Sequence, residues 1–273
     1  MQSYSILPRE MAASLWRNHG LISAMVKREV VGRYRGSVMG IAWSFLNPLV
    51  MLAIYTFVFS AVFKARWGVV GSESQVDFAI ILFAGLIVHG LFAECVNRAP
   101  ALILLNVNYV KKIVFPLEVL PWIAFGSALT HAAISLAVLL LAQLLLSQHI
   151  PWTVILLPFV LLPLVFATMG FAWFLSALGV YVRDIGHITG MLTLGLLFLS
   201  PVFYSIAALP KQYQVWMQLN PLTFVIEEAR NTLIFGVVPD LAQWGTMLAA
   251  SALVAWAGFA WFQKTRKGFA NVL

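Results

Sequence analysis

The sequence predicts an all-α membrane protein with six membrane-spanning helices. Hydrophobic residues make up 62% of the 273 residues and charged residues only 10%, whereas soluble domains average about 25% charged residues. The charges also cluster between long uncharged stretches, most of them near the roughly 20 residues that cross a bilayer as a helix. Composition therefore excludes an ordinary soluble domain and favours one transmembrane domain over residues 1–273.

Six stretches are predicted to span the membrane, and each is bounded by charges or by a break. They cover residues 38–63, 78–97, 117–146, 152–181, 185–201 and 241–262. The third and fourth come from one uncharged stretch that is too long for a single helix, and the polar residues 147–149 with Pro151 divide it. The second is expected to continue past Glu94, which lies four residues before Arg98 and is expected to pair with it.

The basic residues predict the orientation. The formal net charge is +7, and 13 of the 17 Lys and Arg residues fall on the same side as the two ends of the chain. Basic loops stay in the cytoplasm, so both termini are predicted to be cytoplasmic. The positive charge is then an orientation signal that also attracts membrane lipids, and it does not require a nucleic-acid partner.

Two segments on the cytoplasmic side are expected to be helical without spanning the membrane. Residues 9–36 carry apolar side chains at helical spacing, which suits a helix in the membrane interface. Whether this helix is a plain anchor or docks a partner or a substrate head group stays open. Residues 97–118 are too apolar for a solvated loop and too interrupted for a span, so they suit a helix that inserts into a groove of another protein, or else one that lies on the membrane surface.

On the opposite side, residues 202–240 form the longest external segment, and it is rich in aromatic residues and proline. Pro221 after Asn220 predicts a short helix over residues 222–234 that ends near Gly236. Such a helix could dip into the membrane only where protein or a wet cavity surrounds it, so this segment is expected to shape an external mouth. Its charged residues Glu227, Glu228 and Arg230 are either solvated or line that mouth.

Several kinds of chemistry are absent from the sequence. It has no Walker A motif for ATP, no zinc-protease or serine-hydrolase motif, and no histidines at metal-ligand spacing. The centres of the spans carry no charge, which disfavours ion-coupled transport. The spans instead carry uncharged polar and aromatic side chains, which suit either a sugar path or helix packing. The glycine pairs 36/40 and 186/190 have a spacing that favours helix packing.

Six short runs resemble the permease subunits of ABC transporters that export polysaccharides. They are KREVVGRYRGS from Lys27, GIAWSFLNP from Gly40, YTFVFS from Tyr55, NVNYVKK from Asn106, FPLE from Phe115 and NPLT from Asn220. The chain is most similar to the O-antigen export permeases, then to teichoic-acid permeases, and more distantly to capsule permeases.

The resemblance implies a homodimer that pairs with two copies of a separate ATPase. This complex would export an undecaprenyl-diphosphate-linked glycan across the bacterial inner membrane. The chain itself is then no enzyme and holds no cofactor or metal, because the partner binds ATP and magnesium. The alternatives are another lipid-linked polymer, an ion-coupled flippase, and a self-sufficient membrane enzyme, for which the sequence shows no catalytic cluster.

The resemblance also implies roles for individual residues. The segment 97–118 would couple to the ATPase, and residues 202–240 would hold external gate helices. The coupling residues are Leu104, Leu105, Asn108, Tyr109, Lys111 and Lys112; the diphosphate ligands are Arg33 and Arg35; the gate residues are Asn220, Pro221, Phe224, Glu227 and Arg230. Aromatic and polar side chains are expected to line the glycan path, namely Trp43, Ser44, Asn47, Tyr55, Phe59, His131 and Tyr204.

Overall fold

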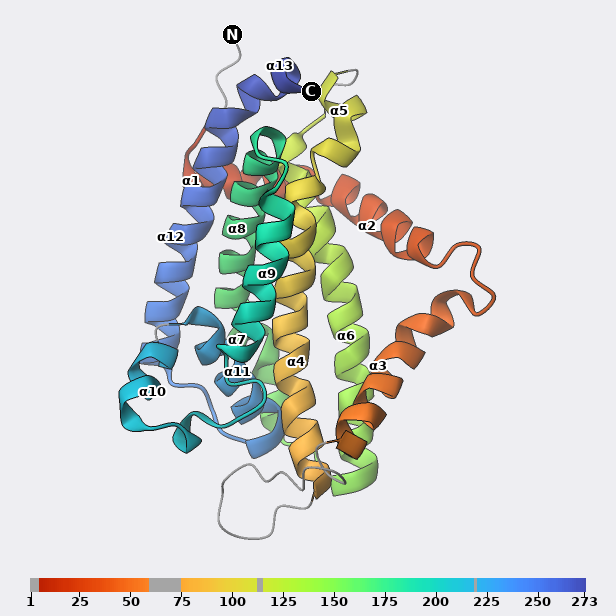
Figure 1. The fold of residues 1–273 in the computed structure, drawn as a ribbon, viewed down its shortest axis with the longest axis vertical. Coiled ribbons are helices and arrows are strands. Elements are labelled where there is room, and N and C mark those ends of the chain that lie inside the picture. The colour runs from red at the N-terminus through yellow and green to blue at the C-terminus, as the bar shows by residue number, and fades with distance from the viewer. Residues whose placement is uncertain (1–4, 59–74, 112–114, 219) are drawn as a thin grey trace.

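The computed structural model describes residues 5–58, 75–111, 115–218 and 220–273, and over these ranges it is helical without any strand (Figure 1). Four helical stretches are long and apolar enough to cross a membrane: Phe78–Ala101, Leu117–Leu146, Trp152–Tyr181 and Leu241–Val272. Trp43–Val58 and Ile185–Phe198 are apolar but shorter. The all-α class is confirmed for the described residues, and the count of six spans stays a prediction.

Five helices run along the long axis of the bundle: α4 (Gln75–Arg98), α6 (Leu120–Ser147), α8 (Leu162–Tyr181), α9 (Ile185–Phe198) and α12 (Leu241–Thr265). Helix α4 lies at the centre. Its most apolar stretch is 72% buried, compared with 17% for the stretch that contains α6. The remaining apolar surface of α6 is therefore left for lipid or for another protein.

The predicted break between the third and fourth spans is present. Helix α6 ends at Ser147, and Gln148 takes the left-handed backbone with a φ of 53°. The following stretch is less regular than predicted for 152–181. It consists of a 3-10 turn (Trp152–Leu156), α7 (Leu157–Val160) and α8, because Pro158 and Pro163 lack the N–H groups that a continuous helix needs.

Helices α8 and α12 pack against each other through glycine. A Cβ atom on Gly258 would lie 2.1 Å from the Gly170 carbonyl oxygen, so the two backbones touch. The glycine pairs 36/40 and 186/190 have no such neighbours among the described residues. Their expected part in helix packing stays a prediction, because spacing alone does not reveal which face meets another helix.

The N-terminal segment differs from the single interfacial helix predicted over 9–36. It forms α1 (Pro8–Arg17) and α2 (His19–Arg33), divided at Asn18, whose side-chain amide donates to the Ser14 carbonyl oxygen at 2.7 Å. Gly36 (φ 87°) and Gly40 (φ 52°) then turn the chain into α3 (Trp43–Tyr55). Because of this turn, α3 begins at Trp43, whereas the first span was predicted to begin at residue 38.

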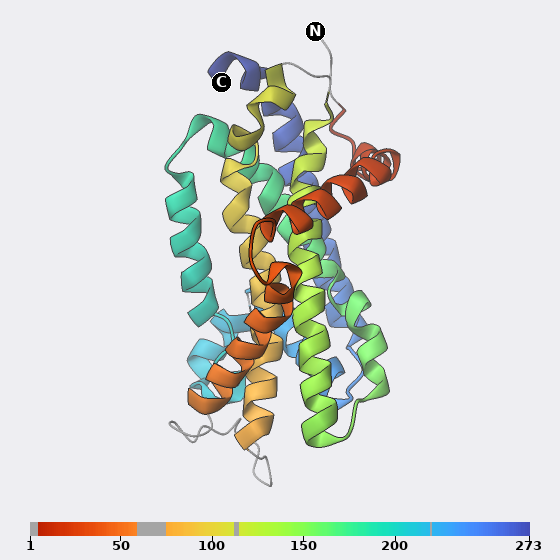
Figure 2. The same ribbon diagram turned by 90° about the vertical axis from the view of Figure 1, so that its right-hand side faces the viewer.

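The C-terminus lies at one end of the bundle, together with α1, which is the first described helix, α5 (Val107–Lys111) and α13 (Phe269–Val272) (Figures 1 and 2). Helices α10 (Lys211–Gln218) and α11 (Pro221–Arg230) lie at the opposite end. We refer to these as the terminal end and the remote end. Helix α2 runs obliquely outward from the bundle near the terminal end, and α3 returns to the bundle toward the remote end (Figure 1).

Candidate functional site

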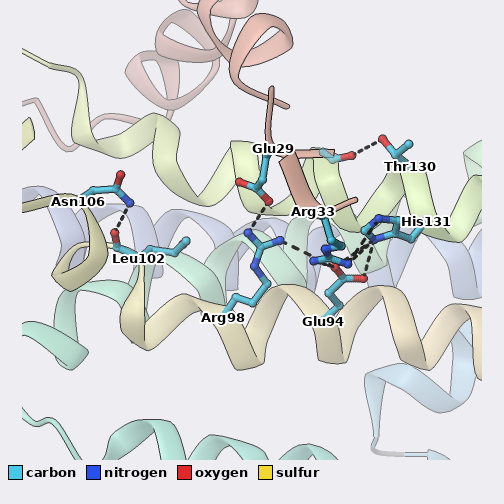
Figure 3. Close-up of polar contacts among 9 residues, drawn as sticks. Glu29, Arg33, Glu94, Arg98, Leu102, Asn106, Thr130 and His131 are labelled. Carbon is cyan, nitrogen blue, oxygen red and sulfur yellow. Dashed lines mark hydrogen bonds and ion pairs between the residues drawn. The ribbon is translucent and has the colours of Figure 1, made fainter. Parts of the chain in front are cut away.

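A cluster of charged and polar side chains joins α2 to α4 and α6 (Figure 3). Its members are Glu29 and Arg33 on α2, Glu94 and Arg98 on α4, and His131 on α6, and we call it the charge cluster. Glu94 is at its centre: Arg33 Nη2 donates to its carboxylate at 2.7 Å, and His131 Nδ1 lies 3.1 Å from it. Arg98 donates to Glu29 and lies 3.8 Å from Glu94.

Helical spacing explains how the charge cluster forms. Glu29 and Arg33 are four residues apart on α2, as are Glu94 and Arg98 on α4, so each helix presents one acid and one base on one face. The predicted Glu94–Arg98 pair is confirmed, but it is the longest contact in the cluster. Two carboxylates balance two guanidinium groups, which allows these charges to sit partly buried at the end of a span.

Arg33 and Arg35, both predicted to hold a lipid diphosphate, lie in different surroundings. Arg33 is engaged by Glu94 and also contacts His131 Nδ1 at 2.9 Å. Arg35 is exposed and lines an open cavity of about 760 Å³ together with Lys27 and Arg28. The basic groups that face this cavity are therefore Lys27, Arg28 and Arg35, and we call it the basic cavity.

The predicted coupling segment contains short 3-10 turns, among them Leu104–Asn106, and one short α-helix, α5, which contacts α2. The Tyr109 ring stacks on Phe115 with centroids 4.4 Å apart, and its hydroxyl accepts a hydrogen bond from Arg28 Nη2 at 3.3 Å. Leu105 is 80% exposed, which makes it an apolar side chain without a partner in the described chain.

The other predicted coupling residues take several positions. Leu104 is half-buried, Asn108 and Lys111 are exposed, and Lys112 lies outside the described residues. The exposed side of the segment thus combines an apolar residue with polar and basic ones.

Three of the predicted path-lining residues share one cavity. Asn47 and Tyr55 from α3 and His131 from α6 line a space of about 270 Å³ between α3, α4 and α6, which we call the polar cavity. Glu94 lines it too, so the charge cluster forms part of its wall. The ring of Tyr34, which lines the basic cavity, meets the His131 ring edge-on with centroids 6.3 Å apart, so the two cavities are close neighbours.

The remaining predicted lining residues do not join this cavity. Ser44 is buried and Trp43 is exposed on α3. The Tyr204 hydroxyl donates a hydrogen bond at 2.7 Å to the carbonyl oxygen of Phe198, the last residue of α9, and so caps the C-terminal end of this helix. Phe59 lies outside the described residues.

The predicted external helix is present as α11, and Asn220 caps it. The Asn220 side-chain oxygen accepts from the Leu222 N–H at 3.0 Å, and Pro221 occupies the first turn, as the sequence predicts. A π-helical turn, Asn231–Phe235, follows, and Gly236 ends it with a φ of 70°.

Arg230 fastens α11 to the bundle. Its side chain is 1% exposed and donates to the carbonyl oxygens of Ile81 at 3.0 Å and Val202 at 2.9 Å, to that of Pro201, and to the Glu227 carboxylate at 3.1 Å. Of the two alternatives for this residue, the solvated one is excluded. The half-buried Phe224 and the exposed Pro221 lie on the same helix.

Only part of the charge cluster was predicted from the sequence. The Glu94–Arg98 spacing indicated one pair, while Glu29 and the contact of Arg33 with Glu94 were missed. The matching four-residue spacing on α2 could have indicated that the two helices pair. Within the described residues, no three His, Cys, Asp or Glu side chains gather as a metal site would require.

A known protein family matches the part of the chain that holds the features described above. The family model described as ABC-2 type transporter matches residues 20–234, which include the charge cluster, both cavities, α5 and α11. The chain is 27% identical over 263 residues to the O-antigen export system permease protein RfbA of Myxococcus xanthus, which covers 96% of this chain and 98% of that protein.

Two further relatives are more distant. The O-antigen export system permease protein RfbA of Klebsiella pneumoniae is 22% identical over 254 residues, covering 93% of this chain and 95% of that protein. The polysialic acid transport protein KpsM of Escherichia coli is 20% identical over 222 residues, covering 80% and 83%.

Proposed function

The chain belongs to the ABC-2 type transporter family, and from this premise we propose that it is the membrane subunit of an ATP-driven exporter of undecaprenyl-diphosphate-linked O-antigen. Membership makes it a multi-pass membrane protein and a transporter subunit. The names of its relatives support a polysaccharide as cargo. Teichoic acid and capsule polymers are the alternative cargoes within the same mechanism.

The observation that carries the proposal is the position of the basic cavity beside the polar cavity. Lys27, Arg28 and Arg35 present cationic groups at the level of the interfacial helix α2, where they can pair with the two phosphates of a lipid carrier. Asn47, Tyr55 and His131 lie beyond Tyr34 and offer hydrogen-bonding groups and an aromatic ring to the sugars that follow. Arg33 is a positioning residue here, because Glu94 and His131 engage it.

Helix α5 is proposed to receive the motion of the ATPase. Leu105, in the 3-10 turn Leu104–Asn106 directly before α5, is an exposed apolar anchor of the kind that docks into a groove of a partner. ATP and magnesium are bound by that partner in two copies, and the permease forms a homodimer. Motion of α5 passes through the Tyr109–Arg28 contact to α2 and from there to the charge cluster.

The orientation follows from the charge distribution. Helices α1, α5 and α13 share one end of the bundle, and 13 of the 17 basic residues belong to segments predicted on this side, so this end faces the cytoplasm. The protein then lies in the bacterial inner membrane with α10 and α11 on the external side. In this orientation α11 is the external gate helix. Arg230 holds it against α4 through the hydrogen bond to the Ile81 carbonyl oxygen.

The test is to co-purify the chain with its ATPase, reconstitute the complex, and measure ATP turnover against lipid-linked glycans. An undecaprenyl-diphosphate glycan should stimulate turnover, and Arg35→Gln should raise the glycan concentration that gives half-maximal stimulation. Arg183→Gln, in the exposed connection between α8 and α9, is the matched control. Glycan transport by the permease without the ATPase, or transport driven by an ion gradient, would overturn the proposal.

A further inference from the structure

A polar cavity and an apolar groove meet at the remote end of the bundle, outside the cavities described above. The first is a space of about 350 Å³ between α10, α11 and the start of α12, lined among others by Thr223, Glu227, Glu228 and Gln243. We call it the acidic pocket. Neither the proposed glycan path nor the anchoring of α11 by Arg230 accounts for it.

The acidic pocket contains buried polar atoms that lack a partner among the described residues. Glu228 is 9% exposed; its Oε1 accepts a hydrogen bond from Asn231 at 3.2 Å, and its Oε2 is buried without one. The hydroxyl of Thr223, a residue that is 3% exposed, is also buried and unpaired. A buried carboxylate oxygen without a donor is costly, so the pocket is built for a ligand that donates hydrogen bonds.

The charge of the pocket indicates that the donor is a cation. Arg230 pairs with Glu227, so its charge is compensated, whereas Glu228 has no basic partner among the described residues. Burial raises the pKa of the Glu228 carboxyl, and Asp240 and Glu227 raise it further against the opposing hydrogen bond from Asn231. A positive ligand would relieve this unfavourable environment and keep the carboxylate ionised.

The adjoining groove is suited to an acyl chain. It has a volume of about 380 Å³, lies between α8, α9, α11 and α12, and is lined by apolar side chains such as Phe171, Leu192 and Val225. Met247 lines both the groove and the acidic pocket, so the two spaces adjoin at this side chain. A ligand that fills both spaces must be an amphiphile with a long apolar chain and a head group that ends in a cation.

We propose that this combined site binds a membrane phospholipid whose head group carries a primary ammonium, as in phosphatidylethanolamine. The ammonium donates to Glu228 Oε2 and the Thr223 hydroxyl, and one acyl chain lies in the groove between α9 and α12. A sugar would satisfy the polar atoms and leave the groove empty. An anionic lipid would place its charge beside Glu228, which costs free energy in a partly buried pocket.

The test is native mass spectrometry of the full-length chain, titrated with phosphatidylethanolamine, phosphatidylglycerol and phosphatidylcholine. One molecule of phosphatidylethanolamine should bind about tenfold more tightly than phosphatidylglycerol, and Glu228→Gln should remove that preference, since hydrogen bonds to a charged group are roughly twice as strong as neutral ones. Phosphatidylcholine keeps the charge but has no N–H to donate, so it should fall between the two.

Control variants distinguish binding of the lipid head group from binding of its acyl chain. Glu10→Gln removes a carboxylate that pairs with Arg17 at the terminal end, and it should leave every affinity unchanged. Ser251→Leu fills the groove and should weaken all three lipids about equally. Glycerophosphoethanolamine, which has the head group without chains, should bind far more weakly than the lipid.

Three results would overturn the inference: equal affinity for phosphatidylethanolamine and phosphatidylglycerol, an unchanged preference in Glu228→Gln, or displacement of the lipid by a soluble sugar. The last result would assign the pocket to glycan. The measurement requires neither ATPase nor cargo, so a failure of the proposed export function would leave the lipid result standing. Elution of Glu228→Gln as a single sharp peak in gel filtration would show that the variant is folded.

Discussion

The charge cluster makes a quantitative prediction about Arg33. Its guanidinium lies 2.7 Å from the Glu94 carboxylate, with 39% of the Arg33 side chain and 26% of the Glu94 side chain exposed. Fully exposed ion pairs contribute about 0.2–1 kcal/mol, and hydrogen bonds to charged groups about 1.5–3 kcal/mol. Solvent screens this half-exposed pair, so its coupling free energy should be about 1 kcal/mol.

The assay is a double-mutant cycle on the free energy of unfolding, measured in mixed micelles by tryptophan fluorescence. The variants are Arg33→Gln, Glu94→Gln and the two combined, with Arg35→Gln and its combination with Glu94→Gln as the matched control. The Arg33 cycle should deviate from additivity by about 1 kcal/mol, and the Arg35 cycle should be additive within about 0.5 kcal/mol. Additivity in the Arg33 cycle, or equal deviations in both, would refute the assignment of Arg33 to the charge cluster.

Three further substitutions test other parts of the molecule. Leu105→Asp should change the free energy of unfolding by less than about 0.5 kcal/mol, because Leu105 is exposed, yet it should abolish ATPase binding in a pull-down; retained binding would remove the turn before α5 from the docking surface. Gly258→Val should lower the midpoint of thermal unfolding, at a cost of about 2 kcal/mol or more, since its side chain would collide with the Gly170 carbonyl; an unchanged midpoint would contradict the close α8–α12 contact. Arg230→Gln should cost about 3 kcal/mol, because it leaves buried carbonyl oxygens and Glu227 unpaired, and chemical unfolding that gave less than about 1 kcal/mol would show that α11 is held in another way.

The helix ends that the sequence predicted correctly are those with a local chemical cause. Pro221 in the first turn after the Asn220 cap starts α11, and the polar break with Pro151 separates α6 from the next helical stretch. The division of the N-terminal segment at Asn18 was not predictable from apolar spacing. It depends on a side-chain amide that competes for the Ser14 carbonyl oxygen, and Asn residues in helices do not always do this.

The functional residues were harder to predict because their partners come from distant parts of the chain. Arg33 and Arg35 are nearly adjacent in sequence, and both precede the first apolar stretch. Only the crossing of α2 over α4 and α6 brings Arg33 to Glu94 and leaves Arg35 facing the basic cavity. For the same reason, Gly170 and Gly258 could not be selected as packing residues, since their contact depends on how α8 and α12 align.

The contacts of α2 favour this helix as the element that links the proposed docking surface to the proposed glycan path. Arg28 contacts Tyr109 on α5, while Arg33, on the last turn of α2, contacts Glu94 and His131 in the wall of the polar cavity. A displacement of α5 therefore reaches the cavity wall through one helix and two direct contacts, without a long chain of intermediate side chains. Because the charge cluster is balanced and partly exposed, its pairs can exchange partners at a cost of about 1 kcal/mol each, which a moving interface can accommodate. A fully buried or uncompensated cluster would instead lock α2 against α4 and block that motion.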